Sequence, residues 1–231
     1  MRTGNTLPIP YESVSHRFIH QAFCPFTFTT KEEEIPIFPF KKTIFTKHII
    51  ALGSIEHGIG VTHLSLALSN FLCSKQGMKV AYVELNATNQ ICSLHPGTEN
   101  THFSHMRIMV FPRTTLTSLP EILSMDFDYF ILDMGILNTY TAREFFKCEK
   151  MFLVCSLSKW KRRHTVEKIA HLLSNTNHTQ EYVTLLVSNG ENESTISISD
   201  RLTFKVYSIP FIPNPFQLHS DFFSFFGKIL R

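Results

Sequence analysis

Short apolar runs alternate with segments of helical period from residue 47 to the end of the chain. The runs are rich in β-branched and aromatic residues, which is typical of buried strands. The expected strands are residues 48–53, 79–85, 107–112, 128–134, 151–157, 182–188 and 204–210. The expected helices are residues 61–76, 119–125, 139–149, 161–175 and 219–231. Strands that are apolar on both faces and separated by helices predict a three-layer α/β fold, in which helices cover both faces of a mostly parallel sheet.

Residues 1–42 differ in amino-acid composition from the rest of the chain. Prolines lie among aromatic residues there, and an acidic triplet occupies Glu32 to Glu34. We therefore expect an irregular N-terminal extension followed by one large domain, residues 43–231. Apolar stretches such as IPIFPF argue against a fully solvated tail, so we expect the extension to lie along the domain or to cover a partner surface.

Composition narrows the class of protein only modestly. Hydrophobic residues make up 43% of the chain, and a formal net charge of +3 is too small to indicate nucleic acid as a partner. No run approaches the roughly 20 apolar residues of a membrane-spanning helix. The start of the chain also lacks the apolar run of a secretory signal, so we expect a cytoplasmic protein. The five cysteines are odd in number and widely spaced, which predicts reduced thiols rather than disulfides or a zinc site.

The stretch GSIEHGIGVTHLS, residues 53–65, joins the first expected strand to the first expected helix. Gly58 and Gly60 allow a tight turn there, which can aim backbone N–H groups and the helix N-terminus at a phosphate. Gly77 then closes the helix, and a second strand with a polar end follows. This order and spacing are typical of a nucleotide-binding βαβ unit.

This unit resembles the ParA/MinD-like family of P-loop ATPases, whose deviant phosphate-binding motif reads KGGxGK[ST]T. Aligning Gly58-Ile59-Gly60 with the GxG of that motif places Glu56 at the signature lysine, His57 at the first glycine, Val61 at the loop lysine, Thr62 at the magnesium-binding hydroxyl and His63 at the last threonine. Both lysines of the motif are therefore absent. The resemblance covers about residues 47–231 and is strongest over the first part of that range.

Two later segments extend the resemblance. VAYVELN resembles the family's VLLVDLD strand, with Glu84 and Asn86 in place of two aspartates, and FDYFILDMG resembles its Walker B strand, with Asp133 retained. The resemblance implies ATP and Mg²⁺ as cofactors. The residues that it assigns to cofactor binding are Gly58, Ile59, Gly60, Val61, Thr62, His63, Glu84 and Asp133, with Thr62 and Asp133 as the Mg²⁺ ligands.

The missing lysines decide how much of the family's activity carries over. A P-loop lysine reaches the β and γ phosphates and neutralises charge during phosphoryl transfer, which Val61 cannot do. Glu56 would add negative charge beside a polyphosphate, and a charge pair near 4 Å is worth roughly 1 to 4 kcal/mol. The sequence therefore favours a protein that is not an efficient ATPase and binds nucleotide weakly or not at all.

Each residue of the loop also has a purely structural explanation. The glycines permit a tight turn, Thr62 can cap the helix, and backbone amides can satisfy Asp133. A protonated His57 or His63 could replace the lost cations. Neutral histidines that pack in a filled-in pocket are the favoured interpretation.

Three other features carry alternatives. The basic cluster Ser158–His164 surrounds Trp160 and could meet nucleic acid or anionic lipid, although a solvated helix start with a half-buried Trp160 is favoured. The expected helix 219–231 resembles the amphipathic membrane helix of MinD-like proteins, but its wide apolar arc favours core packing. The candidate metal ligands His95, His102 and His105, near Cys92, are interpreted as surface histidines.

These patterns favour a scaffold or localisation factor that acts through protein contacts, and the nearest functional analogy is the TadZ/CpaE-like localisation proteins. A functional ATPase with a substitute basic residue, Lys159 or Arg163, is the first alternative. A DNA- or membrane-surface binder that uses the basic cluster is the second. The family dimerises across its nucleotide face through the signature lysine, so Glu56 argues against a nucleotide-sandwich homodimer and favours a monomer or a constitutive assembly.

Overall fold

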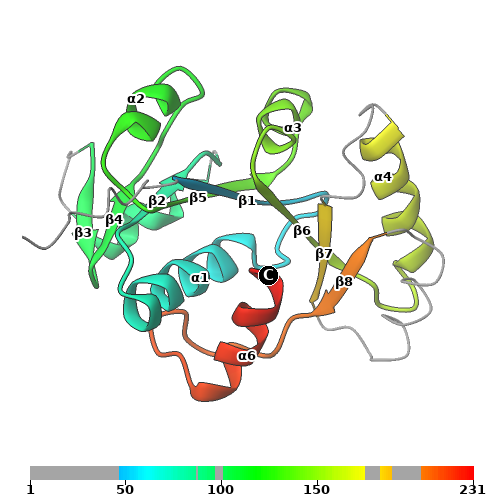
Figure 1. The fold of residues 1–231 in the computed structure, drawn as a ribbon. Coiled ribbons are helices and arrows are strands. Elements are labelled where there is room, and N and C mark those ends of the chain that lie inside the picture. The colour runs from blue at the N-terminus through cyan, green and yellow to red at the C-terminus, as the bar shows by residue number, and fades with distance from the viewer. Residues whose placement is uncertain (1–46, 87, 97–100, 175–182, 189–203) are drawn as a thin grey trace, which may run out of the picture. The chain divides into compact units, whose positions relative to one another are not determined.

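The computed structural model describes residues 47–86, 88–96, 101–174, 183–188 and 204–231. Figure 1 shows these residues as a central sheet with helices on either side. The predicted extension, residues 1–42, lies outside the described residues, so its irregular structure and its boundary with the domain stay predictions.

The core of the fold is an eight-stranded sheet with the order β3-β4-β2-β5-β1-β6-β7-β8. The strands are β1 (His48–Ser54), β2 (Val80–Glu84), β3 (Phe103–His105), β4 (Ile108–Phe111), β5 (Tyr129–Ile136), β6 (Lys150–Ser156), β7 (Val183–Ser188) and β8 (Lys205–Ser208). All neighbouring strands are parallel except β3, which runs antiparallel to β4 at one edge. The predicted mostly parallel sheet is confirmed, and β3 is an addition to it.

Helices cover both faces of the sheet, as the sequence predicts (Figure 1). The helices are α1 (Val61–Gln76), α2 (Leu119–Ser124), α3 (Thr139–Phe145), α4 (Arg162–Ser174) and α6 (Ser220–Ile229), and a short 3₁₀ helix, η1, spans Gln90–Leu94. The core that contains α1 and α6 lies on one face, and the core that contains α2, α3 and α4 lies on the other. The third helix is shorter than the predicted 139–149 because the chain turns after Phe145 to enter β6.

Helix α6 packs into the core, as its wide apolar arc predicts. Phe222, Phe225, Phe226 and Ile229 are all buried, and the ring of Phe226 stacks on Phe71 of α1 with centroids 5.1 Å apart. The apolar stripe is therefore occupied by α1 and the sheet. None of the helices in the described part of the chain has the length and apolar character needed to span a bilayer.

The four cysteines among the described residues are free thiols, and Cys24 lies outside those residues. Cys73 and Cys155 are buried, and Cys92 and Cys148 are partly buried. Burial is the largest cause that raises the pKa of Cys155 to about 12, so this thiol stays protonated and packs as a small apolar side chain.

The parallel strands place the predicted site residues at one edge of the sheet. Strands β1, β2, β5 and β6 are neighbours and point the same way, so the loops that follow their carboxyl ends share this edge. The register sets Glu84 of β2 beside Asp133 of β5, and Leu52 of β1 on the other side of Asp133. We refer to this side of the sheet as the carboxyl edge.

Candidate functional site

The loop between β1 and α1 keeps the backbone form of a phosphate-binding turn. Gly58 and Gly60 have φ angles of 72° and 92°, which L side chains rarely adopt. Nothing lies within 4 Å of a Cβ built on either glycine, so the backbone conformation, rather than crowding, requires glycine. Gly60 caps α1 without a side-chain hydrogen bond, so no side chain of the cap covers the first N–H groups of the helix.

Two clefts flank this loop and share His57, Gly58, Ile59, Gly60 and His63. One cleft, of ≈ 470 Å³, extends past the ends of β2 and β5 to the start of α3. The other, of ≈ 560 Å³, extends past the ends of β6 and β7 to residues 209–212. The loop thus separates the two clefts and lines both of them. Val61, which follows the loop, is buried, with 7% of its surface exposed.

The phenol of Tyr82 stands between the two candidate Mg²⁺ ligands. Its hydroxyl donates to Oδ2 of Asp133 at 2.6 Å. The side chain of Thr62 lies near enough to the same hydroxyl to lower the pKa of Tyr82. The backbone N–H of Gly135 donates to Oδ1 of Asp133 at 3.0 Å. Both Tyr82 and Asp133 are fully buried, so the two carboxylate oxygens are satisfied inside the protein.

This arrangement does not fit a bound magnesium ion. Mg²⁺ requires near-octahedral oxygen ligands at about 2.0–2.1 Å, and the phenol occupies the path between Thr62 and Asp133. Burial raises the pKa of Tyr82 well above its ordinary value, and the negative charge of Asp133 raises it further, while the bond from Thr62 lowers it. The phenol therefore stays protonated and donates to Asp133. Sequence reasoning did not single out Tyr82, although a buried tyrosine in a strand signals that its hydroxyl needs a partner.

Glu84 supports loops rather than lining either cleft. Its carboxylate accepts the backbone N–H groups of Ile91 at 3.3 Å and of Arg113 at 3.1 Å. Burial is the largest cause that raises the pKa of Glu84, and these two amide bonds act in the opposite direction. The side chain joins η1 and the loop after β4 to the end of β2. Arg113 is held there with a positive φ of 51°.

Asn86, at the other position where the family motif has an aspartate, follows β2 and lines the smaller cleft. Its Oδ1 accepts the backbone N–H of Thr88 at 3.0 Å, which closes a local turn. Its buried Nδ2 has no hydrogen-bond partner among the described residues. Asn86 also packs against Gly135, where an added Cβ would come within 2.7 Å of the Asn86 Cβ.

Glu56 points toward α4 of its own chain. The hydroxyl of Thr165 donates to Oε1 at 2.9 Å, and Nζ of Lys161 lies 3.9 Å from Oε2. Only 9% of the Glu56 side chain is exposed. The backbone N–H of Glu56 also bonds to Oγ of Ser54 at 3.2 Å, which fixes the start of the loop. The residue at the signature-lysine position therefore anchors the loop within the chain, and Lys161 balances part of its charge.

The two histidines of the loop differ in environment. His63 is partly buried, and its Nε2 lies 2.7 Å from the backbone oxygen of Ile212. A carbonyl only accepts, so Nε2 carries a proton and donates in this bond. His63 thereby ties α1 to the segment that follows β8, in agreement with the favoured packing role. His57 is exposed beside both clefts.

The basic cluster Ser158–His164 is more exposed than the sequence interpretation allowed. Trp160 is 81% exposed, so the expectation of a half-buried indole is wrong. The ring extends into solvent at the junction between β6 and α4, and Nζ of Lys161 lies 4.7 Å from its centroid. Arg163 is 93% exposed and pairs with Glu167 at 2.9 Å. Of the cluster, Lys161 is the basic residue that lines a cleft beside the loop, whereas Lys159 and Arg163 line neither.

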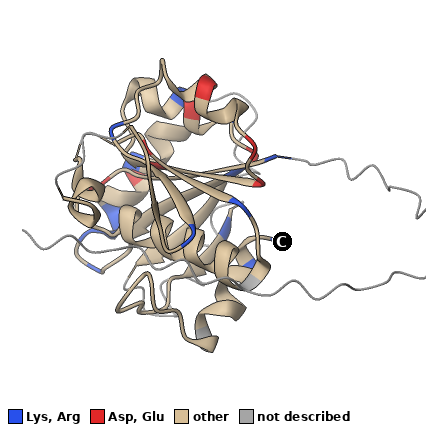
Figure 2. Cartoon of the chain, turned by 90° about the vertical axis from the view of Figure 1, so that its left-hand side faces the viewer, with Lys and Arg blue, Asp and Glu red and all other residues tan. Residues whose placement is uncertain are grey.

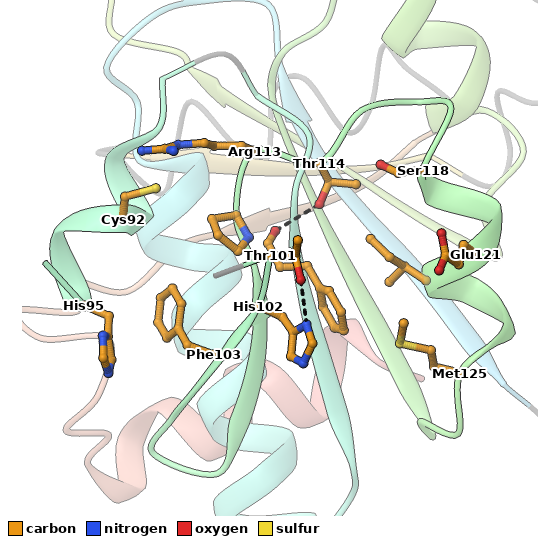
Figure 3. Close-up of a pocket in the computed structure, with 13 residues that line it drawn as sticks. Cys92, His95, Thr101, His102, Phe103, Arg113, Thr114, Ser118, Glu121 and Met125 are labelled. Carbon is orange, nitrogen blue, oxygen red and sulfur yellow. Dashed lines mark hydrogen bonds between the residues drawn. The ribbon is translucent and has the colours of Figure 1, made fainter. Parts of the chain in front are cut away.

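A third cavity, of ≈ 380 Å³, lies between β3, β4, η1 and α2 (Figure 3). Cys92, His95 and His102 line it, and Figure 3 shows them spread around the cavity rather than pointing toward one another. His95 packs on Phe103, and among the residues that the structure describes no group of three or more His, Cys, Asp or Glu could hold a metal ion. His95 and His102 are exposed, whereas His105 is half-buried, and its ring packs edge-on against Phe216 with centroids 4.6 Å apart.

Several solved structures have a fold similar to this one. The fold is similar to a plasmid partition protein from Borrelia burgdorferi bound to AMPPNP, with a TM-score of 0.61 and 14% identity over 80% of this chain and 97% of that one. It is also similar to the MinD cell division protein of Aquifex aeolicus, with a TM-score of 0.53 and 17% identity over 78% and 86% of the two chains. Cobyrinic acid a,c-diamide synthase from Mycobacterium smegmatis with ADP and magnesium gives a TM-score of 0.57 and 14% identity over 74% and 89%.

Sequence comparison adds nothing to these structural matches. No protein-family model matches the chain, and no curated protein matches it in sequence. At identities of 14% to 17% the structural likeness establishes the fold alone. The chain has the fold of a P-loop NTPase. Within that class, the structures that it resembles are of the ParA/MinD kind, as the motif order predicts.

Proposed function

We propose that the protein is a degenerate ParA/MinD-like P-loop protein that acts as a non-catalytic scaffold or localisation factor. The observation that carries this proposal is the buried hydrogen bond from Tyr82 to Asp133, which occupies the carboxylate that would hold a metal ion. In P-loop enzymes a hydroxyl and a carboxylate at these positions hold the metal ion that neutralises the phosphates. Here the carboxylate accepts a hydrogen bond from a buried tyrosine, and Val61 brings no charge to the loop.

Nucleotide binding is weak or absent under this proposal. The loop amides and the open cleft of ≈ 470 Å³ can still face an anion. Each lost cationic interaction removes transition-state stabilisation that the backbone alone does not replace. Two solved structures of similar fold hold AMPPNP and ADP, and this chain has Val61 where the motif of the family that it resembles has a lysine.

Contacts with proteins are supported by the aromatic residues around the loop. Tyr140, Trp160 and Phe211 are 71%, 81% and 85% exposed, and each follows the carboxyl end of a strand. Large exposed aromatic side chains are enriched in protein interfaces. Because Glu56 bonds to Thr165 within the chain, we propose a monomer or a constitutive assembly rather than a nucleotide-sandwich dimer. The TadZ/CpaE-like localisation proteins and a cytoplasmic location fit this role.

Calorimetric and thermal titration of the full chain with Mg²⁺-ATP and Mg²⁺-GTP tests the proposal. A ligand at 100 times its Kd stabilises a protein by about 2.7 kcal/mol, so tight binding would produce a large rise in melting temperature. We expect little or no rise at millimolar nucleotide and no steady release of phosphate. Sustained phosphate release that disappears in Asp133→Asn would overturn the proposal. A parallel loss in Lys161→Gln would identify Lys161 as the substitute basic residue of a working ATPase.

A second candidate function is binding to DNA or to a membrane surface through the basic cluster. The exposure of Trp160, with Lys161 over its ring, favours this candidate over a purely solvated helix start. Association that weakens steeply with salt and is lost in Trp160→Ala with Arg163→Glu would support it. These two side chains are exposed, so the fold should survive both changes, and unchanged association in the double variant would exclude the candidate.

A further inference from the structure

A cavity of ≈ 220 Å³ lies at the opposite edge of the sheet, where β6 and β8 begin. We refer to this side as the amino edge. Four basic residues from separate parts of the chain line this cavity: Lys150, Lys205, Lys228 and Arg231. Thr184 and Tyr207 line it as well. Figure 2 shows several blue segments close to the end of the chain marked C. The cluster cannot be recognised from sequence, because its members are up to 81 positions apart, from 150 to 231.

These basic residues differ from their neighbours on the same edge. Lys79 pairs with Asp126 at 2.7 Å, and His48 pairs with Glu149 at 2.8 Å. No ion pair or hydrogen bond joins the side chains of the four basic residues to any other residue that the structure describes. Glu149 also lines the cavity, but its Oε2 is bonded to His48. Among the described residues that line the cavity, four cations therefore outnumber one carboxylate, that of Glu149.

Ordinary structural roles explain only part of the cluster. Lys228 lies in the last turn of α6, where a cation complements the helix dipole. Lys205 lies on β8, the last strand of the sheet, where a lysine discourages pairing with another chain. Neither role explains why both residues share one cavity with Lys150 and Arg231. Gathering like charges costs Coulomb energy, which a bound anion offsets.

We infer that this cavity binds a compact phosphate-bearing anion, either a free oligophosphate or the headgroup of a lipid. Lysine ammonium groups bind phosphate oxygens as point charges, and an arginine adds a bidentate fork. A cavity of ≈ 220 Å³ lined by four cations and by the hydroxyls of Thr184 and Tyr207 suits a compact anion. The site is separate from the glycine loop, because β1 alone, with 7 residues, sets the two edges roughly 23 Å apart.

Calorimetric titration of the full chain with pyrophosphate tests this inference. We expect saturable binding with a Kd of about 1 mM or tighter at low ionic strength. The double variant Lys205→Gln with Lys228→Gln should weaken it by at least about tenfold. Both lysines are exposed, so the melting temperature should stay unchanged. Two controls should bind as the wild type does: Lys79→Gln at the same edge, and Lys161→Gln beside the glycine loop.

Flotation with phosphatidylcholine vesicles, with and without phosphatidylinositol phosphate, separates the two sources of phosphate. Binding to the phosphorylated vesicles that the double variant loses indicates a headgroup, and binding to pyrophosphate alone indicates a free ligand. The inference is overturned if pyrophosphate does not bind, if only double-stranded DNA binds, or if Lys161→Gln abolishes binding while the double variant retains it. The last outcome would assign the anion to the glycine loop.

Discussion

The carboxyl edge and the amino edge of the sheet treat charge in opposite ways. At the carboxyl edge, where the backbone resembles a nucleotide site, the carboxylates of Glu56, Glu84 and Asp133 all accept hydrogen bonds from within the chain. At the amino edge, the basic residues around the cavity have no partner among the described residues. A retained backbone shape thus says little about ligand binding until the charges around it are traced to their partners.

Glu84→Ala is expected to have the largest effect on stability. It tests whether hydrogen bonds from within the chain hold the carboxylates of the carboxyl edge. The change leaves two backbone N–H groups, of Ile91 and Arg113, without an acceptor in a buried site. We expect a loss of about 3 kcal/mol in the free energy of unfolding, measured by urea denaturation. Glu84→Gln keeps one acceptor oxygen and should lose less. Equal losses in the two variants would show that the side-chain volume, rather than the amide bonds, is what matters.

Tyr82→Phe is expected to have the next largest effect. It removes the donor to a buried oxygen of Asp133, which should cost about 2 kcal/mol in the free energy of unfolding. It also clears the space between Asp133 and Thr62, so Mg²⁺ should raise the melting temperature of this variant and leave the wild type unchanged. Tyr140→Phe, at a tyrosine that is 71% exposed, is the control. A wild type that responds to Mg²⁺ as strongly as Tyr82→Phe would show that the phenol does not block the site.

A smaller effect is expected from Thr165→Val. It removes the hydroxyl that donates to Glu56 and leaves that carboxylate with Lys161 as its one remaining side-chain partner. We expect a loss of about 1 kcal/mol and faster hydrogen exchange of the loop amides at residues 56–60. Thr115→Val, on an exposed threonine, provides the comparison. Unchanged exchange at the loop would mean that Glu56 does not anchor it.

The smallest expected effect is on the pH dependence of the free energy of unfolding. The folded-state pKa of Glu84 is raised above 4.5, so the protonated form is favoured in the folded chain. The stability that this group contributes is fully present below about pH 4.5 and is lost as the pH rises through the folded pKa. The free energy of unfolding of the wild type should therefore fall relative to Glu84→Gln over that range. Parallel pH profiles for the two proteins would contradict the raised pKa.

The sequence predicts the fold well because the spacing of apolar residues follows directly from which positions are buried. Seven strands follow apolar runs, whereas β3, only three residues at Phe103–His105, has no apolar run to reveal it. The end of α3 was placed too late because Phe146 and Cys148 extend the apolar pattern beyond the last helical turn.

The candidate site was predicted only as far as its backbone. The glycines and Asp133 follow from local order along the chain. The phenol of Tyr82 reaches Asp133 only because β2 pairs with β5, a neighbour relation that one sequence does not contain. The direction of the Glu56 side chain depends in the same way on where α4 packs. The basic cavity depends on where separate segments of the chain meet in the fold.

The placement of Trp160 has a practical consequence. The chain contains 1 tryptophan, and its indole lies over Lys161, which in turn faces the carboxylate that anchors the glycine turn. Tryptophan emission from the unlabelled protein therefore originates next to Lys161, which lines the larger cleft. Any molecule that draws Lys161 away from Glu56 should change the intensity or wavelength of that emission. The protein therefore carries its own fluorescent reporter of ligand binding in the larger cleft.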